Sequence, residues 1–154
     1  MNSVGLRPAS AIRQAIPSFS CFYRKRAVSQ ISLSDMHIFS TRGILVENGD
    51  EINLHDIRLE IKEGNALEAK DSKNISYDRV TVKTPLQNIP YLVLASCSDV
   101  RITNCYQPEL IPLLVKADEK SENIIVANNI LPGTTALVSN TGKNIVTSNN
   151  IIKK

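Results

Sequence analysis

Carboxylate and imidazole side chains are the groups in this 154-residue chain that could carry acid–base chemistry. Asp35 and Asp56 each lie within two residues of a histidine, His37 and His55, and two carboxylates can act as a general acid and a general base. Both aspartates, however, occupy the same place in a repeating pattern whose later copies have Asn there. We therefore interpret them as turn residues rather than as a catalytic pair. The two histidines occupy different places in the repeat, and we expect ordinary core or surface roles for them.

No other motif in the chain assigns a reaction. The sequence has no nucleophile elbow, phosphate-binding loop or zinc-ligand spacing. Its three cysteines are an odd number, and Cys97 and Cys105 form no CxxC pair with each other or with Cys21. We expect buried or free thiols in a reducing compartment. We assign no catalytic residue, no metal and no cofactor.

The charge is concentrated at one end of the chain. Residues 1–34 contain five basic residues and no acidic one, whereas residues 35–154 contain 13 basic and 15 acidic residues, a net charge of −2. This balance argues against a basic nucleic-acid-binding body, and Arg24, Lys25 and Arg26 alone would make few phosphate contacts. No apolar run reaches about 18 residues, so we expect no membrane partner.

The elements that must position these side chains come from an internal repeat. Apolar residues alternate at i and i+2, which is the period of a strand rather than of a helix. Each repeat opens on an aliphatic anchor, and successive anchors are 21, 23, 25, 24 and 21 residues apart. The anchors are Ile31, Ile52, Ile75, Val100, Ile124 and Ile145.

Each repeat contains up to three short strands. A second apolar pair follows the anchor strand in the first three repeats, and a third strand closes the repeat, as in 44–46 and 92–94. One such coil cannot bury its aliphatic row alone, but coils stacked about 4.8 Å apart bury a continuous column. The sequence therefore predicts an all-β fold, a parallel β-helix of about five coils over residues 30–154. A leucine-rich repeat and a helical repeat fit less well, because Leu does not dominate and no segment keeps a 3.6-residue period.

A column of turn residues lies four positions after the anchors. Asx side chains bond their own backbone and tolerate the left-handed conformation, so we predict a tight bend there, with side-chain amides bonding between coils. Arg79 is the exception, and we expect Asp78 to take its place in the turn. Gly43 and Gly64 are expected to turn the chain before the third strand. The column comprises Asp35, Asp56, Arg79, Asn104, Asn128 and Asn149.

This cadence resembles the pectin-active β-helix proteins, above all the polygalacturonases of glycoside hydrolase family 28. The segments 73–82 and 121–129, which carry Asn-Ile followed by alternating apolar residues, are typical of the C-terminal coils of that family. The resemblance covers about residues 30–154. It implies a right-handed parallel β-helix, a pectin-type polysaccharide as substrate and a periplasmic or extracellular location, although residues 1–29 lack the compact apolar core of a secretory signal.

The catalytic motifs of that family are absent. Asn-Thr-Asp, Asp-Asp, Gly-His-Gly and Arg-Ile-Lys do not occur, and Arg101-Ile102-Thr103 matches only two residues of the last. The expected function is therefore the C-terminal β-helix portion of a polygalacturonase-like glycoside hydrolase, catalytically incompetent as this chain. The alternative is a non-catalytic structural or carbohydrate-binding β-helix module.

Two insertions are the candidate polysaccharide-binding surfaces. The segments 83–91 and 106–112 carry Pro and Tyr between coil strands, and Tyr91 and Tyr106 could line a sugar-binding groove. The alternative is that these loops only pack over the coil.

Residues 1–29 form a basic leader, which we expect to be either poorly structured, with a short helix broken at Pro17, or an N-terminal cap. Its composition also fits a mitochondrial transit segment or a non-native lead. Phe19, Phe22 and Tyr23 could cover the first coil as an apolar lid. Without such a cap, the unpaired strand edges at the coil ends would favour self-association.

Overall fold

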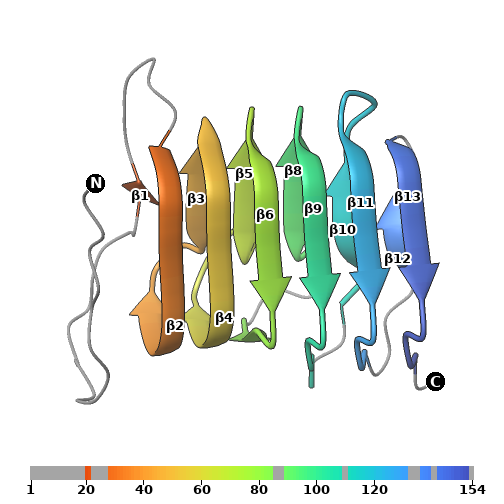
Figure 1. Cartoon of the computed structure of the whole chain (residues 1–154). Coiled ribbons are helices and arrows are strands. Elements are labelled where there is room, and N and C mark those ends of the chain that lie inside the picture. Colours follow the sequence, from red (N-terminus) through yellow and green to blue (C-terminus); the bar gives the residue numbers. More distant parts are fainter. Residues whose placement is uncertain are drawn as a thin grey trace.

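The computed structural model describes residues 20–21, 28–84, 89–108, 111–131, 136–139 and 142–152. These residues form a β-solenoid of about five coils, in which every strand pair is parallel and no described residue is helical (Figure 1). The two rows of strands in Figure 1 are the two sheets of the solenoid, and each successive coil adds one strand to each row. The predicted all-β parallel β-helix is confirmed.

The first sheet contains the anchor strands. Its strand order is β13-β11-β9-β6-β4-β2, and the short strand β7 pairs with the far end of β4. The strands are β2 (Val28–Ser40), β4 (Gly49–Ile61), β6 (Lys73–Asp78), β7 (Thr81–Lys83), β9 (Ser98–Thr103), β11 (Glu122–Ala127) and β13 (Lys143–Ser148).

The second sheet contains the predicted third strands, in the order β1-β3-β5-β8-β10-β12. Apart from β1, each lies where the sequence pattern placed it. The strands are β1 (Ser20–Cys21), β3 (Ile44–Glu47), β5 (Leu67–Lys70), β8 (Leu92–Ala95), β10 (Leu113–Ala117) and β12 (Ala136–Ser139).

The anchors pair directly with one another through the whole stack. Ile31 pairs with Ile52, and the pairing continues unbroken through the other anchors to Ile145. The four central anchors are at most 2% exposed. Because side chains of a strand alternate between faces, this register places every anchor in the interior and the following residue outside.

The column four residues after the anchors forms a bend in the left-handed conformation, as predicted. All six residues have φ between 49° and 58°, including Arg79 itself at 49°, so the expected replacement of Arg79 by Asp78 is wrong. The bend does not end the strand in the first two coils, where β2 and β4 run through it as strands of 13 residues. The bend requires the left-handed backbone conformation, which Asn and Asp adopt at a lower free-energy cost than most other residues with a side chain.

The amide ladder inside the solenoid lies one residue later than the predicted column. Asn129 donates from Nδ2 to the carbonyl of Ile102 (3.1 Å), and its Oδ1 accepts from the backbone N–H of Cys105 (2.9 Å). Asn150 repeats the arrangement one coil on, accepting from Asn129 at 2.9 Å and 3.0 Å. The Asn129 amide is fully buried and that of Asn150 is half-buried, and both satisfy backbone groups that the bend leaves without a strand partner.

The two glycines before the third strands have different reasons for their residue type. Gly64 has φ of 75°, a conformation that L side chains rarely adopt. At Gly43 a Cβ would lie 2.0 Å from the carbonyl oxygen of Asn65, so the close approach of the next coil excludes any side chain.

The basic leader contributes β1, which pairs with β3 through Ser20–Leu45 and Cys21–Val46, and the first two residues of β2, Val28 and Ser29. The predicted apolar lid of Phe19, Phe22 and Tyr23 lies outside the described residues, as does the predicted short helix apart from Ser20 and Cys21.

Candidate functional site

Four charged or imidazole side chains meet where β4 and β6 reach the bend. His55 and Asp56 come from one coil, and Asp78 and Arg79 come from the next, because His55 pairs with Asp78 in the sheet. The imidazole lies between the two carboxylates, with Nε2 2.9 Å from Asp56 Oδ2 and Nδ1 2.9 Å from Asp78 Oδ2. Arg79 binds Asp56 in a bidentate pair, through Nε at 2.6 Å and a second nitrogen at 2.7 Å, and also contacts His55.

The contacts hold both carboxyl groups in the ionised form. The hydrogen bonds from Arg79 lower the pKa of Asp56, and its charge acts in the same direction. Partial burial by itself raises the pKa of Asp78, but hydrogen bonds from Thr103 and Asn104, together with the charge of Arg79, leave it below its ordinary value. Asp56 in turn raises the pKa of Arg79. The proton donor of a glycoside hydrolase typically has a raised pKa, and the contacts of these two carboxyl groups act in the opposite direction.

Asp56 lies at the predicted turn, and it also has a charge partner, Arg79, that the sequence pattern did not indicate. Asp35 occupies the same bend one coil earlier and is exposed. Asp56 is engaged by Arg79 in a bidentate ion pair. The arrangement is a charge network that ties two coils together.

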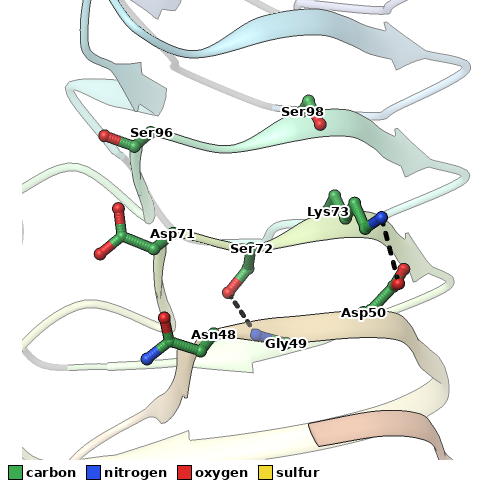
Figure 2. A pocket seen from close by; sticks show the side chains of 8 residues that line it. All are labelled: Asn48, Gly49, Asp50, Asp71, Ser72, Lys73, Ser96 and Ser98. Atoms are coloured by element: carbon green, nitrogen blue, oxygen red, sulfur yellow. Dashed lines mark hydrogen bonds and ion pairs between the residues drawn. The ribbon is translucent and has the colours of Figure 1, made fainter. Parts of the chain in front are cut away.

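A second group of polar side chains lines an open depression of about 530 Å³ on the opposite turn (Figure 2). It lies where the second-sheet strands lead back into β4, β6 and β9. Lys73 and Asp50 form an ion pair at 3.3 Å, and Ser72 accepts from the backbone N–H of Gly49 at 2.9 Å. A hydrogen bond from Asn74, aided by Lys73, lowers the pKa of Asp50.

The outer rim of this depression is a stacked column of left-handed residues. Asn48, Asp71 and Ser96 have φ of 52°, 49° and 54°, and Figure 2 shows their side chains pointing outward from three successive coils. Asp71 forms no ion pair with another described residue. Such a row of amide, carboxylate and hydroxyl groups can hydrogen-bond a polyhydroxylated ligand.

The two tyrosines singled out in the sequence do not come together. Tyr91 is only 5% exposed and its hydroxyl donates to the carbonyl of Val82 at 2.7 Å, so its ring belongs to the core and cannot face a sugar. Tyr106 is 48% exposed on the outer surface. Of the two, Tyr106 remains a candidate binding residue.

A third cluster surrounds Glu60 and was not found by sequence reasoning. Its carboxylate accepts from His37 at 2.9 Å and lies 3.5 Å from Arg58 and 3.9 Å from Lys83. Beside it is a surface cavity of about 550 Å³ lined in part by Arg58, Thr81, Lys83 and Pro108. The alternation of outward residues along β4 was the only signal available, because His37 and Lys83 are each 23 residues from Glu60 in the chain.

The thiols and the remaining chemistry agree with a structural interior. Cys97 and Cys105 are free and buried, and burial raises the pKa of both, that of Cys105 to about 12. A thiol with such a pKa is a poor nucleophile at neutral pH.

Among the described residues, no group of three or more His, Cys, Asp or Glu side chains could hold a metal ion. The described part of the chain also contains no helix long and apolar enough to cross a bilayer.

Comparison with known proteins relates the chain to others through its fold. No family model and no curated protein matches the sequence. Among solved structures, the chain is similar to a protein from Parabacteroides merdae ATCC 43184 that is described as a proposed glycosyl hydrolase. The identity is 11%, the TM-score is 0.57, and the match covers 85% of this chain and 81% of that one. At this identity the similarity establishes a shared β-helix fold.

Proposed function

We propose that this chain is the β-helix portion of a polygalacturonase-like glycoside hydrolase, which engages pectin-type polysaccharide and does not hydrolyse it as this chain. The coil cadence of segments 73–82 and 121–129 supports the family, and the shared fold with a proposed glycosyl hydrolase supports the carbohydrate connection. The chemistry of the side chains gives separate support.

The observation that carries the proposal is the bidentate pairing of Arg79 with Asp56 beside Asp78. Inverting and retaining mechanisms both need one carboxyl group that is protonated at the working pH and one that is ionised. Here contacts with Arg79, and with Thr103 and Asn104, lower the pKa of Asp56 and of Asp78, and a catalytic acid needs the opposite shift. This arrangement suits a coil that contributes binding surface rather than bond cleavage.

The proposal is tested by incubating the purified chain with polygalacturonate and measuring new reducing ends. We expect none above the blank, and the same result for the Asp56→Asn and Asp78→Asn variants. Clear turnover by the wild-type chain would show that it is catalytically active and would refute this part of the proposal. Turnover that disappears in either variant would assign the acid–base role to this cluster.

A non-catalytic carbohydrate-binding module is the second candidate, and the depression in Figure 2 favours it. Its outward amide, carboxylate and hydroxyl groups suit a neutral, polyhydroxylated glycan chain. A glycan array would separate the two candidates. Binding of neutral glycans that is lost in Asp71→Ala would favour the module, whereas binding restricted to uronate-containing glycans would favour the polygalacturonase-like protein.

A further inference from the structure

We propose that the outward residues just after the first four bends form a binding strip for an acidic oligosaccharide. The strip lies beside the charge network at Asp56, with which it shares a surface cavity, and is separate from the depression in Figure 2. We define the strip as the aromatic side chains of Phe39 and Tyr106 together with Arg58 and Lys83 between them. The proposal rests on the proposed function only for the identity of the glycan.

The position of the strip follows from the sheet register. His37 pairs with Arg58 and Arg58 with Thr81, while Phe39 pairs with Glu60 and Glu60 with Lys83. These residues therefore form two outward columns on three successive coils. Phe39 lies beside His37, with ring centroids 4.2 Å apart.

Tyr106 continues the strip into the fourth coil. The side chain of the adjacent Gln107 donates to the carbonyl of Val82 (2.7 Å) and accepts from its N–H (3.3 Å), which places Tyr106 next to Thr81. Pro108 lines the same cavity as Thr81 and Lys83. Four coils at the strand spacing of about 4.8 Å give the strip a length of roughly 14 Å, a span that a short oligosaccharide can bridge.

The aromatic side chains give the first reason to expect a sugar. Phe39 and Tyr106 are the two aromatic residues of the described chain that are exposed, at 43% and 48%, and both lie on this one face. Tyr77 and Tyr91 are buried. Exposed aromatic rings at both ends of a polar strip offer apolar platforms for the C–H faces of sugar rings.

The cations give the reason to expect an acidic sugar. Arg58 and Lys83 are 62% and 63% exposed, and both approach the same carboxylate, that of Glu60, at 3.5 Å and 3.9 Å. One carboxylate cannot occupy all the donors of a guanidinium and an ammonium group, so N–H groups remain for a ligand carboxylate. Arg79 is excluded from this role because Asp56 binds it in a bidentate pair.

The test is isothermal titration of the full chain with tetragalacturonate at low salt. We expect Arg58→Ala and Lys83→Ala each to weaken binding at least tenfold, Phe39→Ala and Tyr106→Ala to weaken it several-fold, and the methyl-esterified oligomer to bind poorly. Glu60→Gln should strengthen binding several-fold, because it removes the competing carboxylate. A residue with a merely structural role would not produce this change of sign.

The matched controls are Arg101→Ala and Ile125→Ala, exposed residues of the anchor sheet that lie off the strip, and both should leave affinity unchanged. Thermal unfolding of each variant confirms that it is folded. Failure of the wild-type chain to bind, or binding that survives in Arg58→Ala and Lys83→Ala, would overturn the strip. Binding lost instead in Asp71→Ala would move the site to the depression without affecting the proposed function, and turnover of the ligand would refute the proposed incompetence without affecting the strip.

Discussion

At the scale of single residues, the bend column shows how one position can serve two purposes. Five of its six members are Asp or Asn, which enter the left-handed conformation at low cost, and the sixth is Arg79 with φ of 49°. An arginine gains nothing locally from this conformation. Its bidentate bond to Asp56 offsets the backbone strain and joins two coils.

Two substitutions of Arg79 separate the contribution of its ion pair from the cost of its backbone conformation. Arg79→Ala should lower the thermal unfolding midpoint, because it keeps the strained backbone and removes the pair with Asp56. Arg79→Asn should lower it less, because Asn relieves the strain. Differential scanning calorimetry of the two variants measures the difference. An Arg79→Ala variant as stable as Arg79→Asn would show that backbone conformation does not matter at this bend.

Asp118 is a single residue whose hydrogen bonds link the stability of the fold to pH. Partial burial by itself raises its pKa, but hydrogen bonds from Ser121 and from the N–H of Ser96 outweigh it, and the pKa lies below its ordinary value. A lowered pKa in the folded state means that the stabilisation is complete above the unfolded-state pKa of about 3.9 and is lost as the pH falls through the folded-state pKa.

We therefore expect the unfolding midpoint of the wild-type chain to fall as the pH is lowered below about 4. Asp118→Asn should be less stable than the wild type at pH 7 and should lose less stability on acidification. Asp35→Asn, at an exposed bend of the first coil, is the control. Parallel pH profiles for the wild type and Asp118→Asn would contradict the role of this carboxylate.

At the scale of elements, the register separates interior from exterior by a single residue. Ile124 is fully buried between Val100 and Ile145, whereas its neighbour Ile125 is 37% exposed. Ile124→Ala should cost about 2–5 kcal/mol of unfolding free energy, because it opens a cavity in a packed column. Ile125→Ala should cost less than about 0.5 kcal/mol. Urea denaturation compares the two, and equal losses would mean that the register is shifted.

Much of this architecture could be predicted from the sequence because it repeats. The anchors Ile31 to Ile145, the third strands and the bend column each recur in most coils, so the pattern reports the register directly. The interior position of Asn129 and the burial of Tyr91 could not be predicted, because each depends on a neighbouring coil. The proposed binding strip could not be predicted for the same reason, because its residues come together only across neighbouring strands.

At the scale of the whole molecule, the solenoid adds one strand to each sheet per coil, so its two ends present strand edges. At the first coil, β1 pairs with β3 and extends the second sheet. An unpaired edge is a template for another chain. We therefore expect the strand edges at the ends of the described solenoid to be the surfaces at which chains associate.

Deletion of residues 1–29 should promote association, because it removes β1, exposes the edge of β3 and removes Val28 and Ser29 from the start of β2. Size-exclusion chromatography with light scattering would detect the larger species. The Cys21→Ser variant is the control, since it keeps the backbone that pairs with Val46. Unchanged monomeric elution after the deletion would count against a capping role for this segment.

The proposed function requires that this β-helix binds pectin-type polysaccharide and does not cleave it. The most direct measurement is a calorimetric titration of the full chain with tetragalacturonate, followed by chromatography of the contents of the cell. We expect saturable binding and an oligomer that is recovered intact. No binding, or recovery of shorter oligomers, would contradict the proposed function.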